Sequence, residues 1–273
     1  MSLASFLAAD KRIVQVRLIR VRGSSPREAG AQMFVSADGT IGTIGGGQLE
    51  YMATDHARAM LRSGLHSDKM DVPLGSEIGQ CCGGRVEISL QRMTSADRAT
   101  ALAEREASDR QSPCVYILGA GHVGRALARQ FQHLPVRCSI IDSRGDELAL
   151  VDAAVEARLS AMAEADIRRA PKGSAFIVLT HDHALDFLLT SEALERGDAA
   201  YVGLIGSATK RAKFERYHRA SEARSDTRGL VCPIGATGSP DKRPEVIAAF
   251  VVAEVMDVLT TRCAHDVIAE TTR

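Results

Sequence analysis

Apolar residues recur with one period in the first third of the chain and with another in the second half. In the first third, short apolar runs separated by glycine-bearing turns predict strands at residues 13–21, 32–35, 40–44 and 85–90. Between them, residues 48–62 have helical spacing, with an apolar face made of Leu49, Met52, Ala53, His56 and Met60. This part of the chain therefore predicts a small α+β domain.

The second half alternates short apolar runs with helical segments. Strands are predicted at 114–118, 136–141, 175–180 and 201–205, and helices near 125–131, 185–196 and 244–262. Such alternation is typical of an α/β fold, here a Rossmann-like, doubly wound parallel sheet with helices on both faces. The stretch between the two patterns is rich in alanine and charge, which favours a linker. We therefore expect an N-terminal domain over residues 1–93, a linker over 94–112 and a C-terminal domain over 113–273.

Composition excludes several classes of protein. The chain has 34 basic and 34 acidic residues, zero formal net charge and no tryptophan, which argues against a nucleic-acid partner. Apolar runs stay well short of the roughly 20 residues that a membrane span requires, and the first residues lack a signal-peptide pattern. Six cysteines without a signal peptide predict reduced thiols in a cytoplasmic protein. The absence of a CxxC pair disfavours a structural zinc ribbon.

A glycine motif follows the first strand of the second half. Gly119-Ala120-Gly121-His122-Val123-Gly124 stands between a predicted strand and a predicted helix, the setting in which GxGxxG binds a phosphate. Asp142 ends the next strand, 21 positions after Gly121, where a ribose-binding acid is expected. The pattern leaves open NAD(P), another phosphate-bearing ligand and an unused site. The candidate cofactor-binding residues are Gly119, Gly121, His122, Gly124 and Asp142.

Two more polar segments follow strands of the same predicted sheet. Thr180-His181-Asp182-His183 lies at a carboxyl end, where doubly wound sheets collect ligands, so His181 and His183 are candidates for contact with a metal or a phosphate. The alternative is a polar cap of the following helix. Gly203–Ser207, with Lys210, Arg211 and Lys213 after it, suits an anion or a charged surface helix.

Gln80-Cys81-Cys82-Gly83-Gly84 is the most informative segment of the first domain. Adjacent thiols beside glycines are poor material for a core and rarely form a disulfide with each other; the alternative is two small residues that end a loop. If the fold brings this segment to Gly23–Arg27 and Gly45–Gly47, the three loops offer N–H donors, an arginine fork and a soft sulfur ligand. The candidate binding residues are Ser24, Ser25, Arg27, Gly45, Gly46, Gly47, Gln80, Cys81, Cys82, Gly83 and Gly84, with Cys81 and Cys82 as candidate metal ligands.

Segments in order along nearly the whole chain resemble the XdhC/CoxI family, most closely its xanthine dehydrogenase accessory branch. They are GSSPREAGAQM (Gly23–Met33), DGTIGTIGGGQLE (Asp38–Glu50), GQCCGG (Gly79–Gly84), VYILGAGHVGRALA (Val115–Ala128), THDHALD (Thr180–Asp186), GLIGSATKRAKF (Gly203–Phe214), CPIG (Cys232–Gly235) and KRPEVIAAFVVAEV (Lys242–Val255). Many members of the wider family carry cysteine where this chain has Gln48. This departure places more weight on Cys81 and Cys82.

The resemblance implies a carrier rather than an enzyme. Such proteins look like chaperones that bind and protect molybdenum cofactor, support its sulfuration by a cysteine desulfurase and insert it into xanthine dehydrogenase, an enzyme of purine metabolism. The cofactor is a pterin with a phosphate and a dithiolene-bound metal. Cys81 or Cys82 would then contact molybdenum, and Arg27 with backbone N–H groups of the glycine loops would hold the phosphate. We expect a cytoplasmic homodimer.

Two other functions compete with the carrier hypothesis. The glycine motif and Asp142 would also suit an NAD(P)-dependent oxidoreductase. No residue stands out as a partner in hydride transfer, although His181 and His183 could serve. A purely structural adaptor for a dehydrogenase would bind its partner without any cofactor. Nucleotide titration separates the first from the carrier, and partner binding with and without cofactor separates the second.

Overall fold

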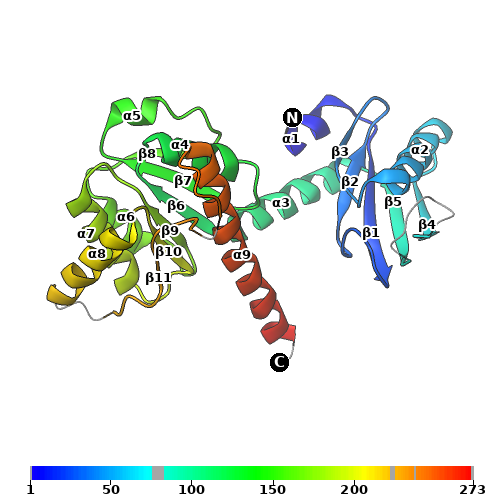
Figure 1. Ribbon diagram of the computed structural model, residues 1–273. Coiled ribbons are helices and arrows are strands. Elements are labelled where there is room, and N and C mark those ends of the chain that lie inside the picture. Colours follow the sequence, from blue (N-terminus) through cyan, green and yellow to red (C-terminus); the bar gives the residue numbers. More distant parts are fainter. Residues whose placement is uncertain (1, 76–82, 222–224, 237, 272–273) are drawn as a thin grey trace. The chain divides into compact units, whose positions relative to one another are not determined.

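A computed structural model describes residues 2–75, 83–221, 225–236 and 238–271 of the chain, with side chains through residue 261 (Figure 1). The chain divides into two compact units, unit 1 up to Ala107 and unit 2 from Ser108. This division falls inside the stretch 94–112, which the structure shows to contain a helix, α3 (Ser95–Gln111). Among the described helices, none combines the length and the apolar character that crossing a membrane requires.

Unit 1 contains an antiparallel sheet in the order β3-β2-β1-β5-β4. Its elements are α1 (Leu3–Ala9), β1 (Val14–Arg22), β2 (Gln32–Val35), β3 (Thr40–Gly42), α2 (Gly47–Ser63), β4 (Ser67–Pro73) and β5 (Arg85–Arg92). Alternate residues of β1, among them Val14 and Val16, are buried on one face, and the apolar stripe of α2 covers them with Leu49, Ala53 and Met60. The apolar side chains at the predicted alternate positions of β1 thus pack against α2 and hold it on the sheet.

Unit 2 is a parallel sheet in the order β11-β10-β9-β6-β7-β8. Its elements are β6 (Cys114–Leu118), α4 (His122–Phe131), β7 (Arg137–Asp142), α5 (Gly145–Ala149), β8 (Glu156–Leu159), α6 (Ala163–Arg169), β9 (Ala175–Val178), α7 (His183–Glu195), β10 (Tyr201–Leu204), α8 (Ala208–Ala220), β11 (Leu230–Val231) and α9 (Pro244–Thr271). The strand order reverses between β6 and β9, the point where doubly wound sheets bind ligands.

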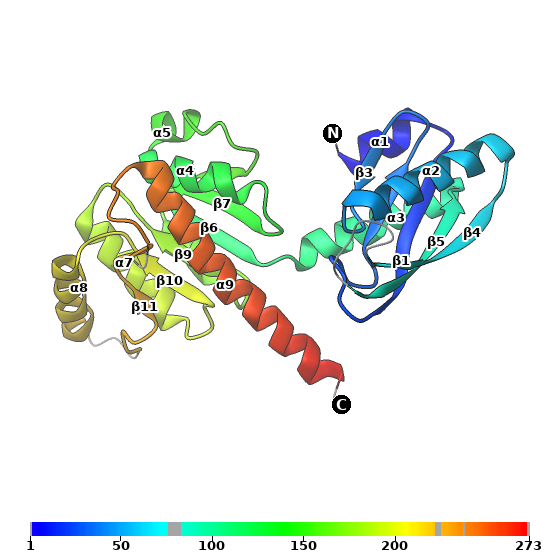
Figure 2. The ribbon, with the colours of Figure 1, turned by 45° about the vertical axis from the view of Figure 1, so that its right-hand side comes forward.

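Both faces of this sheet are covered, as its continuous apolar strands require. Helices α4 and α9 lie on one face (Figure 2). Phe131 of α4 and Val251 of α9 belong to the same core as Ile117 of β6. Helices α6, α7 and α8 lie on the other, where Leu189 and Phe214 join the core. The predicted fold class, a Rossmann-like parallel sheet with a smaller α+β domain, is confirmed.

Some details differ from the prediction. His56 was expected on the apolar face of its helix, but it is half-buried, with Nε2 2.7 Å from Oδ2 of Asp68. Strand β4 was not predicted, because its apolar positions, Met70 and Val72, are few and only Val72 of its residues is buried. The short edge strand β8 also escaped prediction, since none of its residues is fully buried.

Candidate functional site

The three glycine-bearing loops of unit 1 meet around the loop of residues 23–27. A Cβ atom on Gly84 would lie 2.0 Å from the carbonyl oxygen of Ser24, so the two backbones are in direct contact. A Cβ atom on Gly45 would lie 3.1 Å from Cβ of Pro26. The structure thus brings these segments together at their described residues. We call loops 23–27, 45–47 and 83–84 the glycine-loop cluster.

Positive φ values shape the middle loop of this cluster. Gly45, Gly46 and Gly47 have φ values of 133°, 77° and 62°, a run that side chains other than hydrogen rarely allow. Helix α2 begins directly at Gly47, so the first-turn N–H groups of the helix open onto the loop. Three glycines in a row are needed to reverse the chain between β3 and α2 within this space.

A carboxylate of the chain itself occupies donors that were expected to hold phosphate. Oε1 of Glu50 accepts hydrogen bonds from the N–H groups of Ile44 at 2.8 Å, Gly45 at 3.3 Å and Gly46 at 2.9 Å, and from the hydroxyl of Thr43. Of the glycine N–H groups that the sequence offered for a phosphate, those of Gly45 and Gly46 therefore already have an acceptor within the chain. Sequence reasoning missed Glu50, although an acidic residue in the first turn of a helix is a recognised sign of such a contact.

The electrostatics of Glu50 agree with this geometry. Partial burial raises the pKa of the carboxyl, but the hydrogen bonds from Thr43 and from the backbone N–H groups outweigh burial and lower the pKa below its ordinary value of 4.5. Glu50 is thus ionised near neutral pH, and its charge stabilises the loop rather than a ligand.

Donors on the other side of the cluster have no partner among the described residues. Oγ of Ser25 is buried and forms no hydrogen bond there. Arg27 is exposed, and the structure gives it no ion pair with a described residue. The N–H group of Gly47 likewise has no acceptor among the described residues. Within the described part of the chain, these three groups and the hydroxyl of Ser24 are therefore the candidate donors for an anion.

The remaining candidates of unit 1 are only partly described. Gly83 has φ 68° and its N–H group donates to the carbonyl oxygen of Leu74 at 2.8 Å, which pins the chain where β5 begins. Gln80, Cys81 and Cys82 lie outside the described residues. Cys82 directly precedes Gly83 in the sequence, so the segment with the two thiols is covalently joined to the glycine-loop cluster at Gly83.

In unit 2, the glycine motif forms a tight turn between β6 and α4. A Cβ atom on Gly119 would lie 2.4 Å from the carbonyl oxygen of Leu179, and one on Gly124 2.0 Å from that of Gly119. Gly121, by contrast, faces open space. His122 is exposed and begins α4, and no side chain caps this helix. The outer glycines thus serve packing, and the central one leaves room above the helix start.

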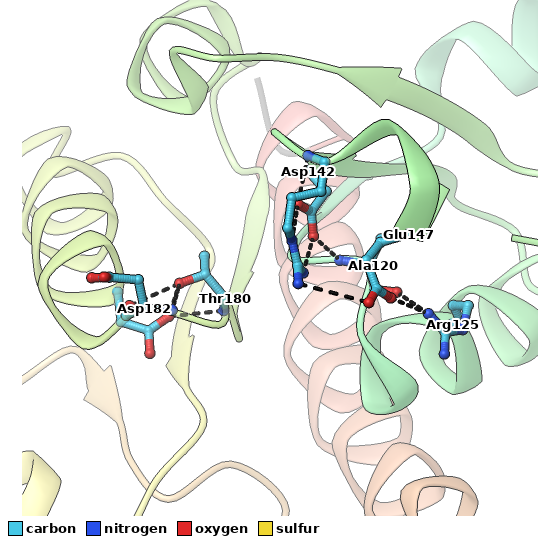
Figure 3. Close-up of polar contacts among 8 residues, drawn as sticks. Ala120, Arg125, Asp142, Glu147, Thr180 and Asp182 are labelled. Carbon is cyan, nitrogen blue, oxygen red and sulfur yellow. Dashed lines mark hydrogen bonds and ion pairs between the residues drawn. The ribbon is translucent and has the colours of Figure 1, made fainter. Parts of the chain in front are cut away.

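Asp142 lies where a ribose-binding acid was expected, at the end of β7, but its oxygens are engaged within the chain. Oδ2 accepts the N–H of Ala120 at 2.7 Å, and Arg144 donates to both oxygens (Figure 3). Burial raises the pKa of Asp142, yet the hydrogen bonds from Arg144 and Ala120 lower it overall. Glu147 lies between two arginines: its carboxylate forms ion pairs with Arg125 and, at 3.7 Å, with Arg144.

The segment after β9 forms the helix cap that was the alternative to a metal site. Oδ1 of Asp182 accepts the N–H groups of Ala184 at 2.7 Å and Leu185 at 2.9 Å, and so caps α7. His183 is 83% exposed, and His181 is exposed as well. Over the described part of the chain, no three His, Cys, Asp or Glu side chains are grouped to hold a metal ion. The structure therefore does not bring the two histidines into a described metal site.

A buried ion pair behind this cap was missed from the sequence. Asp186 is 1% exposed; its Oδ1 accepts the N–H and the hydroxyl of Thr180, both at 2.8 Å, and its Oδ2 pairs with Nζ of Lys210. Arg211 donates to the carbonyl oxygens of Leu230 and Cys232. Two of the three cations that suggested an anion site after β10, Lys210 and Arg211, thus bind groups at the carboxyl ends of the strands instead.

Two family models match the chain in separate segments. Residues 6–68 match the model described as the XdhC and CoxI family, and residues 115–255 match the model described as the XdhC Rossmann domain. The matched ranges contain two loops of the glycine-loop cluster and the whole carboxyl edge of the unit 2 sheet. The second match alone covers more than half of the chain.

Two relatives from Escherichia coli K12 are similar over most of the chain. The molybdenum cofactor insertion chaperone PaoD is 26% identical over 290 residues, which cover 92% of this chain and 85% of PaoD. The uncharacterised protein YqeB is 28% identical over 260 residues, 89% of this chain, but the chain spans only 42% of YqeB. The crystal structure of a xanthine dehydrogenase from Bacillus halodurans matches 95% of both chains with a TM-score of 0.78 at 19% identity, which shows the shared fold.

Proposed function

Because the chain belongs to the XdhC and CoxI family, we propose that it binds molybdenum cofactor and inserts it into a molybdoenzyme. The similarity to PaoD supports this role over nearly the whole chain. In the more specific form of the proposal, the target is xanthine dehydrogenase, and a cysteine desulfurase supplies the terminal sulfido ligand while the cofactor is bound. The protein acts as an accessory factor, and the cofactor is its cargo.

The convergence of the glycine-loop cluster is the structural observation that carries the proposal. The cargo presents a phosphate, a pterin and a thiophilic metal, so its carrier needs anion donors beside a soft ligand. Arg27, the hydroxyl of Ser25 and the N–H of Gly47 are donors without a described partner. The segment with the adjacent thiols joins this cluster at Gly83. The donor set thus fits the cargo.

Each group has a separate task in this proposal. The guanidinium of Arg27 holds the phosphate through paired N–H donors, and the N–H of Gly47, which has no acceptor among the described residues, adds one more donor. The hydroxyls of Ser24 and Ser25 orient the phosphate or the pterin amide. One thiolate, of Cys81 or Cys82, contacts molybdenum; neighbouring side chains of an extended segment point to opposite sides, so the two thiols are unequal.

Cysteine substitutions test the proposal. The chain and its Cys81→Ala, Cys82→Ala and double variants are incubated with molybdenum cofactor and separated from free cofactor. Molybdenum is measured by mass spectrometry and pterin by fluorescence after oxidation. We expect one single variant and the double variant to lose most of their molybdenum, while the other single variant retains it.

A matched control uses a thiol in the core. Cys138 lies on β7, is 8% exposed, and burial raises the pKa of its thiol to about 12, so it is unreactive. Cys138→Ala should bind cofactor like the unaltered chain. Equal molybdenum in all the variants would remove the thiolate contact from the proposal, and loss of pterin in Arg27→Ala alone would still locate the phosphate.

A further inference from the structure

A hollow lies at the carboxyl edge of the unit 2 sheet, beside the glycine turn. Its enclosed part measures about 70 Å³, several times the space that one water molecule needs. Apolar side chains and small polar groups line it, including Leu118, Ile141, Leu185, Ser160 and Thr180. The hollow touches the strands on both sides of the point where the strand order reverses, so it occupies the usual ligand position of this fold.

The neighbourhood of the hollow suits the nucleoside part of a nucleotide. Its apolar walls suit a planar ring, and Gly119 and Asp142 are among the lining residues. Nothing lies within 4 Å of the Cβ position of Gly121, and the N–H groups of His122 and Val123 have no acceptor among the described residues. A phosphate attached to the nucleoside would therefore find space and free donors directly beside the hollow.

Asp142, however, has no acceptor capacity left for a ribose. A carboxylate offers about four positions for donors. Oδ1 takes the backbone N–H and Nε of Arg144, both at 3.0 Å, and Oδ2 takes the N–H of Ala120 at 2.7 Å and Nη2 of Arg144 at 2.9 Å. Two of the four donors come from one guanidinium, in the paired geometry that makes such contacts strong and directional.

The guanidinium is more exposed than the acid and has a second carboxylate within reach. The side chain of Arg144 is 31% exposed, whereas that of Asp142 is 3% exposed. Nη1 of Arg144 also lies 3.7 Å from Oε1 of Glu147, which offers the guanidinium an alternative partner. If the side chain moved, Asp142 would keep the two backbone donors and expose two acceptor positions to the hollow.

We propose that this hollow is a binding site for a ribonucleotide with a free ribose 2′-hydroxyl, and that Arg144 determines whether the site is used. In the described state, the guanidinium fills the acceptor positions of Asp142 that the ribose hydroxyls require. The unaltered chain therefore binds such nucleotides weakly, and releasing Arg144 creates a competent site. This inference concerns unit 2 alone and does not depend on the carriage of molybdenum cofactor.

Titration with NADH and NADPH tests this assignment, using nucleotide fluorescence and the full chain. We expect weak binding to the unaltered chain and at least about tenfold tighter NADH binding to Arg144→Ala, the size of effect that one well-placed charged hydrogen bond produces. NADPH should not gain, because its 2′-phosphate would face the exposed carboxylate of Asp142. Loosening of the fold alone would change both affinities alike.

Three further variants keep the test decisive. Arg144→Gln retains one amide donor for Asp142, so it folds even if Arg144→Ala leaves the buried acid too poorly paired, and it should also gain NADH binding. Adding Asp142→Asn to Arg144→Gln should abolish the gain. Arg129→Ala removes an exposed arginine that pairs with Asp152 on the same unit and should behave like the unaltered chain. Tight NADH binding by the unaltered chain, equal gains for NADH and NADPH, or no gain in a folded Arg144 variant would each overturn the proposal.

Discussion

The two glycine-rich turns of this protein look alike in sequence but differ in which of their donors are free. Before α2, Glu50 accepts hydrogen bonds from Gly45 and Gly46, and the loop has the φ values that only glycine adopts readily. Before α4, the start of the helix is open, and it is the neighbouring acid, Asp142, that is fully engaged. A glycine motif therefore specifies backbone conformation and close packing; whether a ligand can use its N–H groups depends on acids elsewhere in the chain.

Cβ substitutions at Gly84, in the glycine-loop cluster, and at Gly124, in the turn before α4, should give the largest effects. In Gly84→Ala and Gly124→Ala the new atom would lie 2.0 Å from a backbone oxygen, of Ser24 and Gly119 respectively, which cannot move without shifting a strand or turn. We expect each to lose about 3 kcal/mol or more of unfolding free energy in urea titrations.

Gly121→Ala provides the matched control for this steric argument. Its Cβ would meet no atom within 4 Å, and its φ of −65° suits alanine. The expected loss is about 0.5 kcal/mol, as for a helix N-cap. If Gly124→Ala proved as stable as Gly121→Ala, the assignment of the outer glycines to packing would be wrong.

The buried ion pair of Asp186 and Lys210, behind the cap of α7, should give the next largest effect. Lys210→Met leaves the carboxylate of Asp186 buried without its cation, a change that typically costs 3–5 kcal/mol, so we expect about 3 kcal/mol. Lys213→Met, an exposed cation on the same helix, should change stability by less than about 0.5 kcal/mol. Similar losses in both variants would contradict the distinct role of Lys210.

Glu50→Gln should produce a smaller effect that depends on pH. The variant loses charge-assisted hydrogen bonds to the loop, worth about 1–2 kcal/mol at pH 7. Since the pKa of Glu50 is lowered on folding, its contribution is fully present above the ordinary value of 4.5 and disappears as pH falls through the lowered pKa. Unfolding curves of the two proteins should therefore converge in acid.

Asp55→Asn serves as the control for this pH dependence, because Asp55 is exposed on the same helix. It should follow the unaltered chain at every pH. A stability difference for Glu50→Gln that is the same at pH 7 and in acid would show that the carboxylate charge does not hold the loop.

The helix cap after β9 should give the smallest effect. Asp182→Ala removes the acceptor for two N–H groups of α7 and should lower the melting temperature slightly. His183→Ala should leave the melting temperature unchanged, and neither variant should alter zinc content. Loss of bound zinc in His183→Ala would instead restore the metal interpretation of this segment.

The sequence predicted the elements whose burial leaves a periodic pattern. Strands β6, β7, β9 and β10 are apolar runs because helices cover both faces of their sheet. Strands β4 and β8 lie at sheet edges and show no such run. Candidate loops were recognised from their glycines. The contacts of Glu50, and the pairing of Asp186 with Lys210, escaped notice because a charged residue on a helix does not reveal which distant groups it meets.

Arg144 is a different case, since it stands only two positions after the acid that it engages. The spacing from the glycine motif placed Asp142 correctly at the end of β7. The motif does not include Arg144, whose guanidinium occupies the oxygens of Asp142. A guanidinium within reach of a ribose-binding acid is thus a signal worth reading from sequence. It distinguishes a glycine motif whose acid is engaged within the chain from one whose acid is free to bind a ribose.

The central claim, that this protein carries molybdenum cofactor, is tested most directly by the amounts of pterin and molybdenum bound after equilibration with the cofactor and removal of the free form. The account predicts close to one pterin and one molybdenum per chain at saturation, and loss of pterin when Arg27 is replaced by alanine. Pterin and molybdenum at the background level of an unrelated protein of similar size would contradict it.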